Sequence, residues 1–141
     1  MRVAAPDTDL IAKLRSALVL GPRLKLAVLF GLRALGAPRS PRSDVDVGIV
    51  PFDSALDLRA ELSLASALSG AVALEIDLVR LDREEPVLDR EVAVDGVCLY
   101  EEAPGVFAAW RAEAASRFIE FEETIAPHRE RFLRRLAGGR V

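Results

Sequence analysis

The sequence predicts an α/β (α+β) fold: a small mixed β-sheet flanked by helices, with a long C-terminal helix. Short apolar runs of strand length alternate with segments in which apolar residues recur every three or four positions. Beyond residue 102 the helical repeat continues without further strand signals. At 141 residues the chain has the length of one compact unit. We therefore divide it into a core, residues 1–102, and a helical extension, residues 103–141, that packs on the core or on a partner.

Composition limits the classes of function. The formal net charge is −3, which argues against general nucleic-acid coating, so no direct nucleic-acid binding is expected. No run approaches the ~18 uncharged apolar residues that a membrane span requires. Charges such as Asp9 and Lys13 interrupt any signal-peptide core near the N-terminus. We expect no membrane association and a cytoplasmic location.

The first half of the chain predicts a helix and two strands. Residues 8–19 carry leucines four positions apart, and a Gly-Pro pair follows them. "LKLAVLFG", residues 24–31, is a strand that ends at Gly31, and "DVDVGIV", residues 44–50, is a second strand. Glycine, proline and serine between the two strands indicate a loop, so the strands are expected to pair.

The second half of the core continues the alternation. A helix is expected over residues 54–69, closed by the glycine that follows. A third strand is expected over 71–81, a short helix over 84–96, and a fourth short strand or an extended tail over 97–102. The predicted order is α, β, β, α, β, α, β.

The extension carries an apolar stripe that steps by threes and fours from Phe107 to Leu136. Pro127 lies inside it and predicts a kink or two helices end to end. Burial of the stripe against the protein's own sheet is the favoured interpretation. A docking surface for a partner chain, or a homo-oligomer contact, is the alternative, and His128 is expected to be a packed or interface residue.

Two acids in the second predicted strand indicate a metal site. Strand side chains alternate, so Asp44 and Asp46 share one face while Val45 and Val47 face the core. Two neighbouring carboxylates are unfavourable unless a cation lies between them or one keeps a proton, and Mg²⁺ prefers such oxygen ligands. Asp77 joins them if the second and third strands are neighbours. Each acid alone is more simply a strand-end residue that faces water, but the combined pattern favours a metal.

The loop before these acids suggests a phosphate site. A strand that ends at Gly31 and gives way to a short helical turn presents backbone N–H groups to phosphate oxygens. Arg33, Arg39 and Arg42 are candidates to neutralise a triphosphate, although exposed loop arginines are commonly only solvated. The segment "GLRALG" matches neither the P-loop nor the dinucleotide-binding pattern.

The combined pattern resembles the minimal nucleotidyltransferases of the DNA polymerase beta superfamily. The resemblance rests on "LFGLRALGAPRSPRSDVDVGIV", residues 29–50, on the amphipathic helix that follows, and on "VALEIDLVRL" with its third acid. It covers residues 24–102 clearly. The family has a Gly-Ser turn where this chain has Leu32 after the glycine.

The resemblance implies a nucleotidyltransferase fold that uses ATP as substrate and two Mg²⁺ ions to bridge the attacking and leaving oxygens at the α-phosphate. In this reading the third acid also helps to activate the attacking hydroxyl. The implied metal-binding and catalytic residues are Asp44, Asp46 and Asp77. The implied nucleotide-binding residues are Gly31, Leu32, Arg33 and Ser43.

The resemblance also implies a partner. Many small members of the family are antitoxins of all-helical HEPN toxins, and some transfer AMP from ATP to a toxin tyrosine. This leads to an enzyme hypothesis, a Mg²⁺-dependent antitoxin that modifies a toxin hydroxyl. It also leads to a binding hypothesis, an antitoxin that masks its toxin by contact alone. Transfer to a small molecule is a weaker third hypothesis, because it normally requires a larger second domain.

Overall fold

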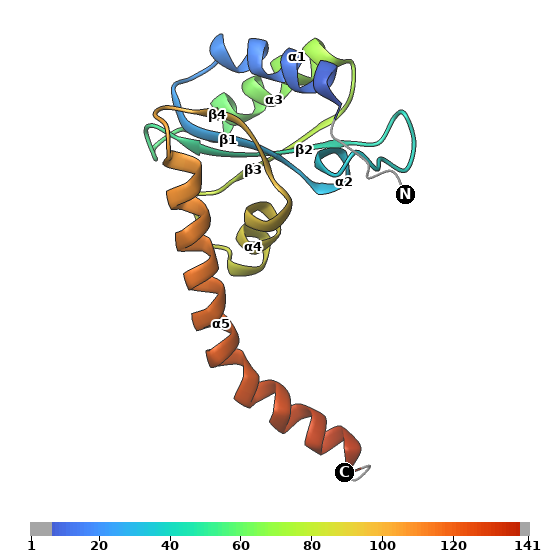
Figure 1. Cartoon of the computed structure of the whole chain (residues 1–141), viewed down its shortest axis with the longest axis vertical. Coiled ribbons are helices and arrows are strands. Elements are labelled where there is room, and N and C mark those ends of the chain that lie inside the picture. The colour runs from blue at the N-terminus through green and yellow to red at the C-terminus, as the bar shows by residue number, and fades with distance from the viewer. Residues whose placement is uncertain (1–6, 139–141) are drawn as a thin grey trace.

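The computed structural model describes residues 7–138 and confirms the predicted fold class. Helices α1 and α3 cover one side of the sheet, and α4 and the start of α5 cover the other (Figure 1). The elements in chain order are α1 (Thr8–Val19), β1 (Leu24–Phe30), α2 (Gly31–Ala34), β2 (Val45–Pro51), α3 (Leu58–Val72), β3 (Ile76–Arg80), α4 (Pro86–Asp95), β4 (Val97–Glu101) and α5 (Val106–Ala137).

The sheet is mixed, with strand order β3-β2-β1-β4 in the described chain. Strand β1 runs antiparallel to β2 and β4, which confirms the predicted pairing of the first two strands. Strand β2 runs parallel to β3. The register places Phe30 opposite Asp46, and Asp46 opposite Asp77. The C-terminal end of β1 therefore meets the N-terminal ends of β2 and β3 at one edge of the sheet.

Two apolar clusters lie on the two faces of the sheet. The leucines of α1 and α3 pack against the Val45 and Val47 side of β2. On the other face, α4 and the first turns of α5 pack against Leu26, Val28 and Phe30 of β1. Because side chains alternate along β2, this second face is also the one on which Asp46 lies. The acids and α4 thus share one side of the sheet.

The third helix is displaced from its predicted bounds. Helix α3 begins at Leu58 because the Asp57 carboxylate accepts a hydrogen bond from the Ala60 N–H at 2.8 Å. It continues through Gly70 and ends at Val72, and the next residue, Ala73, caps it in the left-handed conformation with φ 57°. The predicted ends at 54 and 69 are therefore wrong. The third strand is correspondingly short, because residues 71–75 belong to the helix and its exit turn.

A buried ion pair joins α4 to α5. Asp89 is fully buried, and Nη2 of Arg117 lies 3.6 Å from its Oδ2. Burial raises the pKa of Asp89, and the Arg117 charge opposes that rise. Within the described chain neither Asp89 oxygen has a hydrogen-bond partner. The charge of Arg117 is thus the main compensation for a carboxylate removed from water.

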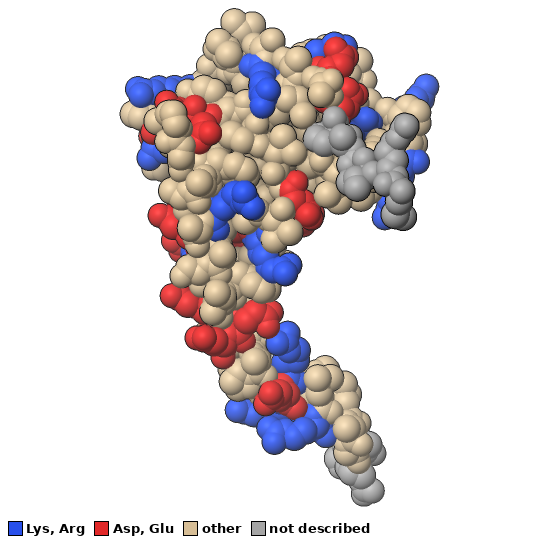
Figure 2. Space-filling view, in the orientation of Figure 1, with Lys and Arg blue, Asp and Glu red and all other residues tan. Residues whose placement is uncertain are grey.

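Helix α5 is one continuous helix with Pro127 inside it, rather than two helices end to end, and it follows a curved path (Figure 1). Trp110 and Ala114 in its first half are buried, but Phe132 and Leu136 are 58% and 60% exposed. The predicted burial of the stripe is therefore confirmed only for the first half of α5, because the helix extends beyond the core that it covers. Acidic and then basic side chains gather along the outer half (Figure 2). None of the helices between residues 7 and 138 combines the length and apolar character needed to cross a bilayer.

Candidate active site

The site is organised by a pair of aspartates on neighbouring strands. Asp46 of β2 and Asp77 of β3 lie directly opposite each other in the parallel register. Val45 and Val47 are fully buried on the opposite face of the sheet, as the alternation of the sequence predicts. The Asp46 side chain is half-buried, and Asp77 is exposed. The structure thus brings together two of the three predicted carboxylates at one edge of the sheet.

Gly31 brings the backbone against this pair. It follows Phe30, the residue opposite Asp46, and has φ +73°, a conformation that side-chain-bearing residues rarely adopt. A Cβ at this position would collide with the Oδ2 atom of Asp46. The glycine therefore permits a close approach between the start of α2 and the Asp46 carboxylate. This contact joins the predicted phosphate turn to the predicted metal ligands.

Negative charge accumulates around Asp46. Its pKa is raised from 3.8 to about 6, first by partial burial and then by the charges of Asp77, Glu91 and Asp44, with a hydrogen bond to Asp77 as a smaller cause. All of these causes act in one direction. A cation bound here would reverse their effect by favouring the ionised carboxylates.

The donor set fits a hard divalent cation, because carboxylate oxygens are the ligands that Mg²⁺ prefers. Of the predicted metal ligands, Asp46 on β2 and Asp77 on β3 lie next to each other. Asp44 is exposed and lies one residue before β2, at the entrance to the strand. Between residues 7 and 138, no three Asp, Glu, His or Cys side chains are gathered closely enough to form a complete metal cage. Asp44 is thus next to Asp46 in the sequence and its charge acts on Asp46, but its side chain does not complete a three-residue cluster with the pair.

Glu91 is a residue of the site that the sequence reasoning missed. It lies on α4, which packs over β1 and α2, and its charge is among those that raise the pKa of Asp46. Leu88 and Val92 mark the inward face of this helix, and Glu91 follows Leu88 by three positions at the edge of that face. This local pattern places Glu91 at the border of the packed surface. Only the docking of α4 brings it near Asp46.

The loop between β1 and β2 is held by Arg33. This side chain is buried, and its Nη2 donates to the carbonyls of Pro41 at 3.0 Å and Ser43 at 2.8 Å. The Ser43 hydroxyl accepts a hydrogen bond from the Ser40 N–H at 2.9 Å. Arg33 and Ser43 therefore shape the loop that leads into the acids, rather than extending into solvent. Leu32 is 40% exposed at the start of α2.

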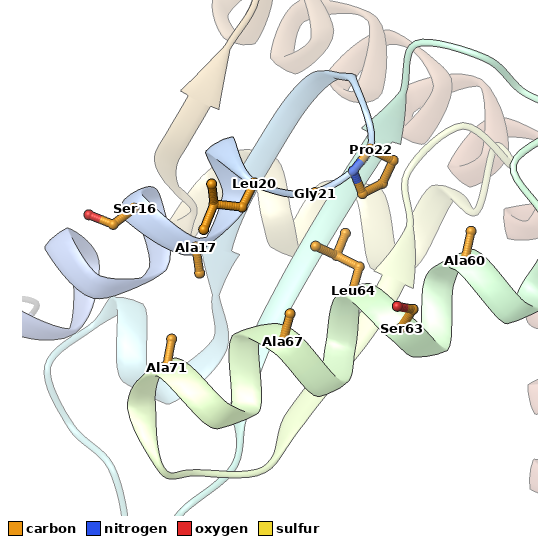
Figure 3. A pocket seen from close by; sticks show the side chains of 10 residues that line it. All are labelled: Ser16, Ala17, Leu20, Gly21, Pro22, Ala60, Ser63, Leu64, Ala67 and Ala71. Carbon is orange, nitrogen blue, oxygen red and sulfur yellow. The ribbon is translucent and has the colours of Figure 1, made fainter.

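A separate groove lies on the other side of the sheet, between α1 and α3, with a volume of about 520 Å³ (Figure 3). Four alanines, Leu20 and Leu64 form most of its walls. Ser16 and Ser63 supply the polar side chains among the described residues that line it, and none of those residues is charged. It offers no group that would bind a metal or a phosphate, so the carboxylate edge is the candidate active site.

Solved structures support the same fold. A chain of a toxin–antitoxin complex with AMP-PNP is 24% identical, with a TM-score of 0.76, and the match covers 87% of this chain and 98% of that one. A chain of a toxin–antitoxin MntA–HepT structure is 23% identical, with a TM-score of 0.72 and coverage of 90% and 99%. A structure described as a tri-AMPylated Shewanella oneidensis HEPN toxin in complex with MNT antitoxin gives 20% identity, a TM-score of 0.68 and coverage of 87% and 98%.

The family is established by the sequence. No curated protein matches the chain. The family model described as "Polymerase beta, Nucleotidyltransferase" matches residues 12–104, which include the Gly31 turn, the three aspartates and Glu91. This range is well over half of the chain and runs from within α1 to beyond the end of β4. The protein therefore belongs to the polymerase beta nucleotidyltransferase family.

Proposed function

We propose that the protein is a Mg²⁺-dependent nucleotidyltransferase antitoxin of the cytoplasm that transfers AMP from ATP to a hydroxyl, that of a tyrosine, on a HEPN-type toxin. The observation that carries the proposal is the Asp46–Asp77 pair beside the Gly31 turn, in a chain of this family. The similar solved structures, described as toxin–antitoxin complexes with AMP-PNP or with an AMPylated toxin, support the choice of nucleotide and partner.

In the proposed reaction the hydroxyl oxygen forms a bond to the α-phosphorus of ATP. The bond from that phosphorus to the oxygen leading to the β-phosphate breaks, and pyrophosphate leaves. Asp44, Asp46 and Asp77 would hold two Mg²⁺ ions, whose chemistry is to neutralise charge on the attacking and leaving oxygens. Asp77, the exposed member of the pair, also helps to accept the proton of the attacking hydroxyl. Arg33 holds the loop in the shape that leads Asp44 toward the pair.

Nucleotide binding is tested by calorimetric titration of ATP into the purified protein, with and without Mg²⁺. We expect heat of binding that requires the metal and that Asp44→Asn removes. Asp9→Asn is a matched control on α1, away from the acid pair, where Asp9 forms an exposed ion pair with Lys13. Metal-independent binding, or equal binding by Asp44→Asn and the wild type, would contradict the proposed site.

Leu32 favours a second candidate function, an antitoxin that neutralises by binding alone. Its apolar side chain is 40% exposed at the turn where a hydroxyl would otherwise contact phosphate. Co-expression with a HEPN-type toxin separates the two functions. If Asp44→Asn still neutralises the toxin fully, transfer of AMP is not required. If neutralisation is lost while the complex still forms, masking alone is insufficient.

A further inference from the structure

We propose that the outer half of α5 pairs antiparallel with the same segment of a second copy of this chain. This outer face is formed by Phe118, Phe121, Ile125, His128, Phe132 and Leu136. Its distal members, Phe132 and Leu136, are more than half exposed, and the helix projects away from the core (Figure 1). The pairing does not depend on the proposed nucleotide chemistry.

The outer face continues the stripe that the core already buries. Trp110 and Ala114 lie on the same side of α5 and are packed against β1 and α4. Farther along, Phe118, Ile125 and Phe132 recur every seven residues, which is the spacing of a helix that pairs with another helix. An apolar face of this kind, extended beyond its own core, is typical of an interaction surface. The spacing indicates that the partner surface is itself helical.

The charges beside this face are self-complementary. Glu122 and Arg129 flank the outer face on one side and lie seven positions apart, joined within the chain by an ion pair of 3.0 Å. In an antiparallel pair about a twofold axis, Glu122 of one copy lies beside Arg129 of the other, and the reverse pair forms as well. In the same register, Phe121 of each copy lies opposite Phe132 of the other. The face therefore matches a reversed copy of itself at its phenylalanine and charged positions, with Ile125 of each copy opposite His128 of the other.

Other arrangements fit less well. In a parallel pair the flank that carries Glu122 and Arg129 lies beside the opposite flank of the other copy, so these two residues do not meet across the interface. Figure 2 shows the acidic side chains nearer the core and the basic ones nearer the C-terminal end of α5, so only reversal of one copy brings opposite charges together. A second copy satisfies this requirement without any other partner. The occupant of the outer face is therefore the same segment of another chain.

Sedimentation of the full chain tests the pairing. We expect the wild type to be a dimer, and Glu122→Arg or Arg129→Glu alone to weaken it by about tenfold, because each change creates two like-charge contacts between copies. Mixing the two variants in equal amounts should restore a dimer. In that mixture both contacts between copies are attractive again, whereas the contact within each chain stays repulsive. Recovery on mixing therefore reports the contact between copies alone.

Two further variants keep the test decisive. The double variant, Glu122→Arg with Arg129→Glu, restores the pairs both within and between chains and should dimerise like the wild type. Glu130→Arg is the matched control: it lies on the opposite side of the helix, is exposed, and should leave the dimer unchanged. A monomeric wild type at about 100 µM would overturn the proposal. So would a dimer that neither single reversal weakens, or one that mixing fails to restore.

Discussion

Replacement of Asp46 by asparagine should stabilise the metal-free protein at neutral pH while removing its response to Mg²⁺. The carboxylate has a pKa of about 6 instead of 3.8 because partial burial and the charges of Asp77, Glu91 and Asp44 disfavour its ionised form. Asparagine occupies nearly the same volume without the charge. The variant therefore removes a charge that burial and the neighbouring acids disfavour, and it leaves the packing beside Gly31 intact.

The size of the expected stabilisation follows from the raised pKa of Asp46. A rise from 3.8 to about 6 is roughly two units, or at most about 3 kcal/mol at ~1.36 kcal/mol per unit. Because Asp46 is only half-buried and solvent screens its neighbours, we expect about 1 to 2 kcal/mol. For a chain of this length that is a rise in Tm of several degrees, at ~2–4 °C per kcal/mol.

The stability gained by the Asp46→Asn substitution depends on pH. Between about pH 4 and pH 6 the folded wild type binds more protons at Asp46 than the unfolded chain does, so its stability falls as pH rises through that window. The stability gained by Asp46→Asn should therefore be small below about pH 4 and complete above about pH 6. Added Mg²⁺ should stabilise the wild type and leave the variant unchanged, because only the ionised carboxylate holds the ion.

Urea unfolding measured across this pH range in EDTA, and repeated with Mg²⁺, checks both statements. Asp9→Asn serves as the control for loss of an exposed aspartate. If Asp46→Asn gives no gain in the free energy of unfolding above pH 6, or the same gain on both sides of the window, burial and the neighbouring acids do not disfavour the Asp46 charge, and the electrostatic reasoning is refuted. If Mg²⁺ stabilises the variant as much as the wild type, Asp46 is not a ligand.

Three other substitutions probe what positions the site. Gly31→Ala should lower the free energy of unfolding by about 1–3 kcal/mol and weaken Mg²⁺ binding, because a Cβ would displace Asp46 and the residue has φ +73°. Thermal unfolding measures the first effect and metal titration the second. Arg33→Leu should expose the loop of residues 36–44 to proteolysis, since its bonds to two carbonyls are lost. Arg117→Leu should lower the free energy of unfolding by about 3 kcal/mol, and by more than Asp89→Asn does, because it leaves a buried carboxylate uncompensated. Equal losses for the two variants in urea unfolding would contradict this.

Much of the fold and half of the site could be predicted from the sequence because they depend on local periodicity. The alternation along residues 44–50 assigned the two valines to the core and Asp46 to the opposite face, since a strand has a period of two whatever surrounds it. The glycine turn after β1 is equally local. Pairing of β1 with β2 followed from two strands joined by a short loop.

Tertiary packing decided the rest. The parallel register that sets Asp46 beside Asp77 joins strands separated by a whole helix, and no local pattern fixes such a register. Docking of α4 brought Glu91 to the acids, and the fold of the loop turned Arg33 inward to its carbonyls. The extent of the core decided where burial of the α5 stripe stops, because the stripe itself has the same period on both sides of that point.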